Sequence, residues 1–462
     1  MSTSTENFIK EIKRELTSDN VLSTKEECYA YAQDASNSRI ITNIPDAVVF
    51  VRSKEDVTEV VNKARKYNIP IICRGAGTNT VVACRIEHGG IILNFSKMNK
   101  ILEINKQNMT AKVQPGVILG NLLEEIEKTG LFFPPDPSNL KVSTIGGCIA
   151  QASGGAKTFK YGSVKNYVLN LEVVTANGEV IKTGSDTVKN ATGYNLTSLF
   201  IGSEGTLGII TEAVLKLIPK PEATKVMMAY FDTVEDAVSA VDMIIDEKIM
   251  PATVDFMDKN AINTVEKFYP AGLLCDKDAA LVIEIDGMAD SIEYQQKITE
   301  NVLKRCNASA IQISHNEEEY DRIWMARRSS MGACAKLKPN VTTDDVIVPR
   351  QNLAKLVYGI REICDKYNLT SCLVGHVGDG SVHPQIPIDY KDEDEYKRFK
   401  LAKSEIYDLT VSLGGIISGE HGIGADKRPY ISKVVGKTSL DYMREIKQVF
   451  DPNNILNPYK IF

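Results

Sequence analysis

The chain lacks the features that mark several large classes of protein. It has no run of about 18 apolar residues, so we expect no transmembrane segment. Residues 1–10 are polar and lack the apolar stretch of a secretory signal, which favours a cytoplasmic location. None of the nine cysteines forms a C-x-x-C pair, so no iron–sulfur cluster motif is visible. The net charge of -6 argues against nucleic acid as a partner.

Histidine is also scarce, and its distribution is uneven. Only five histidines occur in the chain, and three of them lie in two glycine-rich stretches, 375–384 and 418–424. His376 and His383 flank a Gly-Asp-Gly turn that can bring both imidazoles to one point. With Glu420 they could hold a catalytic Zn²⁺ or Fe²⁺, and the sequence therefore predicts a metal-assisted redox or hydrolytic site. The alternative is that both histidines hydrogen-bond within a turn and the core.

The third clustered histidine, His421, directly follows Glu420. Adjacent side chains usually point apart, so Glu420 can face the metal while His421 faces the substrate. A neutral imidazole is a suitable general base near neutral pH. The alternative is that His421 only orients Glu420. The remaining histidines, His88 and His315, lie in polar stretches and are expected to be solvated.

The length and composition predict a large soluble protein with an α+β fold. The chain has 462 residues, of which 43% are hydrophobic, enough for two or three domains. Pro219-Lys220-Pro221 interrupts the pattern and marks a boundary, after which strands and helices alternate as in an α+β domain with helices over an antiparallel sheet. The predicted units are a helical segment at 1–40, domains at 41–220 and 221–425, and a C-terminal segment at 426–462.

Several loops of small residues precede residue 211 and are each set against a predicted strand. They comprise 74–79, 134–138, 143–150, 153–155, 161–162 and 202–210. Glycines free the backbone to turn N–H groups toward an anion. Together these loops suggest one extended diphosphate ligand between two sheets. The first loop alone is weak evidence, because it lacks the third glycine of a Rossmann fingerprint.

These loops and the two histidine-containing stretches resemble those of a known family. Loops 74–79, 136–150 and 202–210 resemble the flavin domain of the vanillyl-alcohol oxidase / p-cresol methylhydroxylase superfamily. Stretches 375–384 and 418–424 resemble the C-terminal domain of its FAD-linked 2-hydroxyacid dehydrogenase branch. The resemblance implies a two-subdomain FAD-binding domain of the vanillyl-alcohol oxidase type. A ferredoxin-like α+β substrate or cap domain would follow, and then a C-terminal helical segment that returns to the FAD domain.

The resemblance also implies FAD in extended form. The FAD would be noncovalent, because no histidine occupies the first loop, where some relatives attach it. The residues expected to contact FAD are Arg74, Gly75, Ala76, Gly77, Thr78, Asn79, Pro135, Asp136, Ser143, Thr144, Gly146, Gly147, Ser153, Gly154, Tyr161, Gly202, Glu204, Gly205, Gly208 and Ile209.

For the substrate, the resemblance implies a small 2-hydroxy acid, with D-lactate first among the candidates. Residues 324–328 are similar to the family's Trp-x-x-Arg segment, which implies that Arg327 grips the substrate carboxylate. Arg328 is the competing assignment, and a surface ion pair is the alternative role. His421 would take the hydroxyl proton, the metal would lower the pKa of that hydroxyl, and a hydride would pass to flavin N5, giving pyruvate.

The electrons would then leave for a separate acceptor. An electron-transfer flavoprotein linked to NAD and ferredoxin, or an iron–sulfur subunit, is implied by the family and fits the absence of cluster cysteines. Glycolate and D-2-hydroxyglutarate are alternative substrates. Two further readings are a non-redox flavin-dependent synthase of ether-lipid precursors and a non-catalytic FAD subunit.

Overall fold

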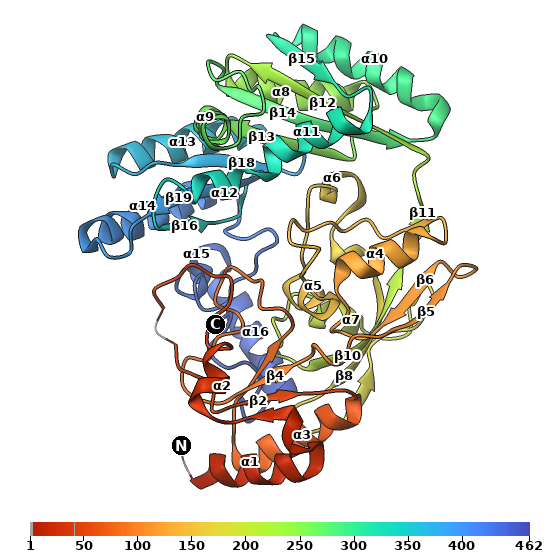
Figure 1. The fold of residues 1–462 in the computed structure, drawn as a ribbon, viewed down its shortest axis with the longest axis vertical. Helices are drawn as coiled ribbons and strands as arrows, with labels where there is room; N and C mark the ends of the chain where they lie inside the picture. The colour runs from red at the N-terminus through yellow and green to blue at the C-terminus, as the bar shows by residue number, and fades with distance from the viewer. Residues whose placement is uncertain (1–2, 41) are drawn as a thin grey trace.

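The computed structural model describes residues 3–40 and 42–462, arranged as two bodies one above the other (Figure 1). Residue 41, where we expected the first domain to begin, lies outside the described residues, as do Met1 and Ser2. The lower body is formed by residues 3–40 and 42–220, which we call the first domain, together with the C-terminal segment, and the upper body is formed mainly by residues 221–412, which we call the cap domain. Within the described ranges, no helix combines the length and apolarity needed to cross a bilayer.

The first domain begins with a small sheet in the order β1-β2-β4-β3, in which β2, β4 and β3 are parallel. Its elements are β1 (Val21–Leu22), β2 (Ala47–Phe50), β4 (Ile91–Asn94) and β3 (Ile71–Arg74), with helices α1 (Thr3–Leu16), α2 (Lys25–Tyr29) and α3 (Lys54–Tyr67). The apolar face of α3, which includes Val57, Val60, Val61 and Ala64, packs on this sheet together with α1. The helical spacing of these residues explains why the sequence predicts this helix.

The second subdomain is an antiparallel sheet in the order β5-β6-β10-β8-β9. Its strands are β5 (Ile101–Asn105), β6 (Thr110–Val113), β10 (Ile209–Lys216), β8 (Val168–Val174) and β9 (Val180–Lys182). Four helices accompany it: α4 (Leu119–Glu127), α5 (Ile145–Gln151), α6 (Thr158–Tyr161) and α7 (Leu196–Phe200), with the short strands β7 (Leu131–Phe132) and β11 (Ile218–Pro219). Strands β8 and β9 form the predicted hairpin, with Gly178 at positive φ in its turn.

The expectation that residues 143–150 form a loop is wrong. Residues 145–151 form helix α5, and the Thr144 side chain caps it by accepting the Gly147 N–H. Two glycines give this segment a poor helix propensity, so local sequence does not announce a helix. Burial of Ile145, Cys148 and Ile149 in the core stabilises it instead.

The cap domain starts with a ferredoxin-like unit. Strands β12 (Ala223–Phe231), β13 (Thr253–Asp258), β14 (Ala279–Gly287) and β15 (Ala310–Ile313) pair antiparallel in the order β15-β12-β14-β13. Helices α8 (Val234–Asp246), α9 (Lys259–Phe268) and α10 (Ala289–Arg305) connect them. This order and the helical crossovers are those of the ferredoxin-like arrangement that the family resemblance implies.

The sheet then continues beyond that unit. Strand β18 (Cys372–His376) pairs with β13, and β19 (Ser381–Ile388) pairs with β18, β16 (Asn340–Thr343) and β17 (Val346–Ile347). The accompanying helices are α11 (Glu317–Arg328), α12 (Ser330–Cys334), α13 (Leu353–Lys366) and α14 (Glu393–Ser412). The extension places β18 and β19, which carry two of the clustered histidines, beside β13 of the ferredoxin-like unit.

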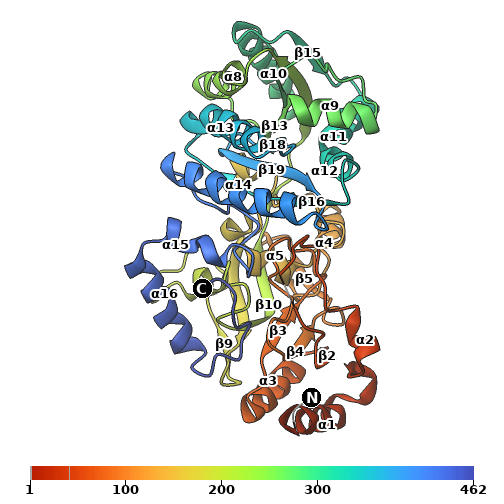
Figure 2. The ribbon, with the colours of Figure 1, turned by 90° about the vertical axis from the view of Figure 1, so that its left-hand side faces the viewer.

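The C-terminal segment returns to the lower body, where α15 (Ile431–Val434) and α16 (Lys437–Phe450) lie beside the first domain (Figure 2). The Lys447 ammonium group donates hydrogen bonds of 2.8 Å to the Thr206 and Leu456 carbonyls. The rings of Phe200 and Phe450 meet edge to face, 5.3 Å apart. The end of the chain therefore contributes to the core of the first domain.

Candidate active site

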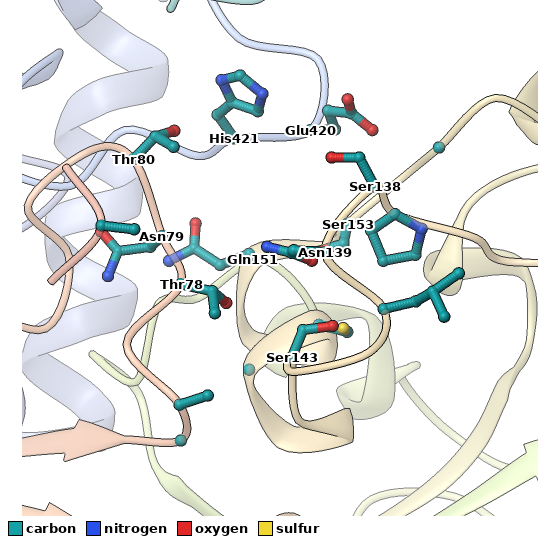
Figure 3. Close-up of a pocket in the computed structure, with 18 of the residues that line it drawn as sticks. Thr78, Asn79, Thr80, Ser138, Asn139, Ser143, Gln151, Ser153, Glu420 and His421 are labelled. Carbon is teal, nitrogen blue, oxygen red and sulfur yellow. The ribbon is translucent and has the colours of Figure 1, made fainter. Parts of the chain in front are cut away.

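A cavity of about 1050 Å³ lies where the two bodies meet. The loop after β3, the start of α5 and the loop after β7 form its lower walls. Side chains from α11, β18, β19 and the 418–424 segment close its upper end. Figure 3 shows His421 and Glu420 on this last segment, above the loops that carry Thr78–Thr80 and Ser138–Ser143.

Most residues predicted to contact the cofactor line this cavity. They are Arg74, Gly75, Ala76, Gly77, Thr78, Asn79, Asp136, Ser143, Thr144, Gly146, Gly147, Ser153, Glu204, Gly205 and Gly208. The rest do not line it, namely Pro135, Gly154, Tyr161, Gly202 and Ile209. Ile209 is fully buried in the core, and the Tyr161 hydroxyl donates to Asp286 of the cap domain at 2.7 Å. Gly154 lies against Glu420 instead, because a Cβ there would be 2.7 Å from Glu420 Oε2.

The lower walls contain glycines at positions where a larger residue would clash with its neighbours. A Cβ on Gly75 would lie 2.1 Å from Thr144 Oγ1, and one on Gly146 would lie 2.6 Å from Pro115 Cβ. Gly77 has φ +72°, a conformation that favours glycine. These glycines let the loops of the walls pack closely on one another and leave main chain, without side chains, along the cavity.

The cavity also gathers polar groups that lack partners. In the described part of the chain, Thr80 Oγ1, Ser143 Oγ, Gln151 Oε1 and Asn457 Oδ1 are buried without a hydrogen-bond partner, and all four residues line the cavity. Buried polar groups are normally satisfied, so such a concentration points to a polar ligand. The exposed backbone and the orphaned groups together fit an extended dinucleotide such as FAD. Sequence reasoning missed Thr80, Gln151 and Asn457, because no local pattern distinguishes them.

At the upper end, His376, His383 and Glu420 converge, and the first two meet across the Gly-Asp-Gly turn that their spacing predicts. The Nε2 atoms of both histidines lie 3.6 Å from Glu420 Oε1. One potential ligand atom from each residue falls within 4.8 Å of the others. Antiparallel pairing of β18 with β19 produces this convergence, because it sets Val374 opposite His383 and brings the two histidines to the same end of the strands.

The opposite ring nitrogens hold the two imidazoles in place. Nδ1 of His376 is 2.6 Å from Asp255 Oδ1, and Nδ1 of His383 is 3.3 Å from the Asp344 carbonyl oxygen. Metal-binding histidines in proteins usually make such a contact with the nitrogen that does not bind the metal. The three side chains therefore fit a divalent cation of the zinc or iron type.

The charges around the cluster favour a neutral His383 and an ionised Glu420, whereas they favour a protonated His376, which a bound metal would have to deprotonate. Burial and the neighbouring His376 lower the pKa of His383 to about 3, which keeps its imidazole neutral. Burial opposes protonation of His376, yet Asp255 and Glu420 raise its pKa well above the usual range. Burial likewise opposes ionisation of Glu420, but the three histidines lower its pKa to about 2. Glu420 is therefore a carboxylate at neutral pH.

His421 and Arg327 complete the upper end. The His421 ring stacks on His383 with centroids 5.3 Å apart. Arg327 Nε lies 2.9 Å from Asp255 Oδ2, so Asp255 contacts both Arg327 and His376. Arg328 also lines the cavity and stacks over Trp324, 5.0 Å from the ring centroid, but it is exposed. His88 and His315 are exposed and lie outside the cavity lining.

Both domains hold the segment that carries Glu420 and His421. From the cap domain, Asp345 accepts the N–H groups of Gly419, Glu420 and His421 at 2.7–2.8 Å. From the first domain, Glu204 accepts the N–H groups of Ile423 and Gly424 at 2.6 and 2.8 Å. Sequence reasoning missed Asp255 and Asp345, which lie far along the chain from the residues they contact.

The fold and the cavity define a flavin-binding oxidoreductase. The family model for the FAD binding domain matches residues 45–184, and that for the C-terminal domain of FAD linked oxidases matches residues 220–461. The chain belongs to the FAD-linked oxidase family. The expected superfamily, the vanillyl-alcohol oxidase type of FAD domain and the FAD cofactor are thereby confirmed.

Relatives cover nearly the whole chain. The chain is 42% identical over 432 residues to the glycolate oxidase subunit GlcD of Bacillus subtilis (strain 168), covering 94% of this chain and 92% of that protein. It is 34% identical over 427 residues to a D-lactate dehydrogenase of Anaerostipes hadrus, covering 90% and 89%. Among solved structures, p-cresol methylhydroxylase with bound substrate superposes with a TM-score of 0.85 at 20% identity, covering 100% of this chain and 97% of that chain.

Proposed function

We propose that this protein oxidises a small 2-hydroxy acid to the 2-oxo acid with FAD as the primary acceptor, and that D-lactate is the first substrate to test. The observation that carries the proposal is the convergence of His376, His383 and Glu420 beside His421 and Arg327, at one end of the cavity that fits FAD. Relatives named as a glycolate oxidase subunit and a D-lactate dehydrogenase support the substrate class.

Each side chain at this end has a role that its position suits. Arg327 would bind the substrate carboxylate through the guanidinium nitrogens that Asp255 does not contact. His421 would accept the proton of the substrate hydroxyl. His376, His383 and Glu420 would hold a divalent metal, which would supply positive charge beside that hydroxyl. When bound, FAD supplies the two-electron acceptor for the reaction.

Glycolate is the second candidate, favoured by the 42% identity to a glycolate oxidase subunit. The two acids differ by one methyl group, and such a difference changes selectivity by only about 10–200-fold in an apolar pocket. The word "subunit" in that relative's name also supports a separate protein as the final electron acceptor. We propose an electron-transfer flavoprotein or an iron–sulfur protein in that role.

The test is anaerobic bleaching of the flavin absorbance by D-lactate, L-lactate, glycolate and D-2-hydroxyglutarate, with and without prior chelation. We expect one acid to bleach the flavin quickly, with loss on chelation and recovery on addition of Zn²⁺ or Fe²⁺. Changing His421 to Ala should leave FAD and metal bound and slow reduction by about 10²–10⁴-fold. The matched control is His315→Ala, because His315 is exposed and remote from the cavity.

The alternatives give different outcomes. No bleaching by any of the four acids in metal-loaded protein would reject the proposed oxidation and favour a non-redox synthase or a silent FAD subunit. Bleaching that survives chelation would reject the metal site alone. Reduction of the His421→Ala variant at the unaltered rate would reject His421 as the base.

A further inference from the structure

Asp345 has an unusual position for a carboxylate. It lies between β16 and β17, and no part of it is exposed to solvent. Its Oδ2 atom accepts N–H groups from Gly419 at 2.8 Å, Glu420 at 2.7 Å and His421 at 2.8 Å. The Ser418 hydroxyl also donates to it, at 3.1 Å. One carboxylate oxygen thus holds four consecutive residues, including a proposed metal ligand and the proposed base.

The other oxygen of Asp345 faces two cationic or ionisable groups. The ammonium group of Lys427, which is also fully buried, donates to Oδ1 and to the Ile417 carbonyl. Nδ1 of His421 lies 3.4 Å from the same Oδ1. Because Lys427 neutralises the carboxylate, the buried pair avoids the large cost of an unpaired charge.

The contact between Nδ1 and Asp345 therefore orients the His421 ring. Its Nδ1 atom is buried and, within the described residues, makes no hydrogen bond, so the Asp345 carboxylate acts on it as a charge 3.4 Å away. A carboxylate oxygen near Nδ1 favours the tautomer that carries its proton there. The Nε2 atom, on the opposite edge of the ring, then has a free lone pair and points away from Asp345. His421 lines the cavity, where that lone pair can accept a proton.

We propose that Asp345 is a positioning residue for two reacting groups at once: it fixes the main chain that presents Glu420, and it sets the tautomer and orientation of His421. The inference rests on the proposed function, because it gives His421 the role of base. Asp345 itself does not line the cavity, so it would touch neither the substrate nor the cofactor. Its effect on the reaction passes through the 418–421 main chain and the His421 ring.

The sharpest variant is Asp345→Asn, which keeps the size of the side chain. Its amide oxygen can still accept the three N–H groups, and Lys427, which loses the Asp345 charge, still has the Asp344 carboxylate 3.5 Å away, so the loop can keep its shape. Its NH₂ group, however, would face Nδ1 of His421 and favour the opposite tautomer. We expect flavin reduction by the active 2-hydroxy acid to slow by about 10²–10⁴-fold in rate. The substrate concentration that gives half the maximal rate should change little, and FAD and metal content should stay near those of the unaltered protein.

A second measurement does not depend on activity. Nitrogen NMR of protein with isotope-labelled histidine, with the His421 signal identified by its loss in His421→Ala, reports which ring nitrogen carries the proton. The unaltered protein should show the proton on Nδ1, and Asp345→Asn should shift the population toward Nε2. This readout remains informative if no tested acid reduces the flavin, so failure of the proposed function and failure of this inference are distinguishable.

The matched control is Asp258→Asn. Asp258 is also fully buried, accepts two backbone N–H groups and pairs with Arg361, but it does not line the cavity. We expect this control to reduce its flavin at the unaltered rate. An equal loss in both variants would overturn the inference, as would normal reduction in Asp345→Asn. If Asp345→Asn does not fold, a proton on Nε2 of His421 in the unaltered protein would overturn it on its own.

Discussion

At the scale of single residues, two buried carboxylates, Asp255 and Asp345, hold the reacting side chains of the proposed site in position. Asp255 contacts both His376 and Arg327, so the proposed metal ligand and the proposed substrate cation share one anchor. Asp345 likewise contacts both Lys427 and the main chain beside His421. A buried charge that loses its partner is strongly destabilising, so these carboxylates fix geometry and stability together.

Asp258 supplies a prediction about stability and pH. Burial raises the pKa of this carboxyl to about 6, although Arg361 and two backbone N–H groups oppose the shift. In an unfolded chain an aspartate titrates near about 3.9. The folded state therefore binds the proton more tightly, and the stability this group contributes is complete below about pH 4 and is lost as pH rises through about 6, by about 3 kcal/mol.

Replacing Asp258 by Asn removes that titration. We expect the free energy of unfolding of the unaltered protein, relative to the Asp258→Asn variant, to fall between about pH 4 and pH 6 and then to level off. Urea unfolding of both proteins across this range measures the difference. Parallel stability curves would contradict the prediction.

The same scale shows what the sequence could reveal about the site. His376, His383, Glu420 and His421 could be predicted because histidine is rare and these residues sit in glycine-rich stretches. Asp255 could not, because aspartate is common and a distant strand carries it, 121 residues from His376. Pairing of β13 with β18 sets the two residues directly opposite one another. That register follows from tertiary packing, which no local pattern encodes.

At the scale of elements, periodicity predicted helices with apolar stripes and missed those that packing alone stabilises. The stripe of α3 identifies it from sequence, whereas α5 has seven residues and two adjacent glycines. Gly146 of α5 is needed because the helix starts against the turn before α4. The Gly146 N–H donates to the Pro115 carbonyl at 2.8 Å, leaving no room for a side chain.

Gly146→Ala is therefore expected to displace α5. The new Cβ would lie 2.6 Å from Pro115 Cβ and 3.0 Å from its carbonyl oxygen, which is backbone and cannot rotate away. Overpacking of this kind costs about 1–3 kcal/mol. We expect a lower free energy of unfolding and weaker retention of FAD, measured by flavin released during gel filtration. Gly436→Ala is the control, since nothing lies within 4 Å of a Cβ there. Full FAD retention by Gly146→Ala would reject this role for Gly146.

At the scale of the whole molecule, the proposed site depends on how the two bodies dock. The FAD loops belong to the lower body, while the histidines, Asp255 and Arg327 belong to the upper one. The alternation of strands and helices predicted an α+β domain, and the family resemblance implied its ferredoxin-like form. The sequence did not predict that β18, β19 and β16 extend the same sheet, because β18 joins the sheet through β13 and β16 joins it through β19, and both pairings link strands far apart in the chain. The extension brings the metal-type cluster down to the cavity.

Charged contacts across the junction help to hold the two bodies together. Helix α6 of the first domain lies just below the cap domain (Figure 1), and Lys160 on this helix pairs with Asp286 of β14. Only 1% of the Asp286 side chain is exposed, and Tyr161 also donates to it. Nearby, Lys157 lies 3.2 Å from Asp136 and 3.9 Å from Glu284. Buried acids of the cap are thus neutralised by lysines of the first domain.

Lys160→Met should weaken this docking, because among the described residues it leaves the Tyr161 hydroxyl as the side-chain donor to the buried Asp286 carboxylate. Loss of one partner from a buried pair costs about 3–5 kcal/mol. The control is Lys220→Met, because Lys220 and Glu127 form an exposed pair whose loss costs below about 1 kcal/mol.

The single tryptophan, Trp324, lies in the cap domain, so its fluorescence reports the upper body while flavin fluorescence reports release from the cavity. In urea, the unaltered protein should lose both signals together, and Lys160→Met should release flavin first. Adding Asp286→Leu to Lys160→Met should recover part of the loss, because no charge then remains buried. Coincident transitions at the unaltered midpoint in Lys160→Met would show that the pair does not hold the domains together.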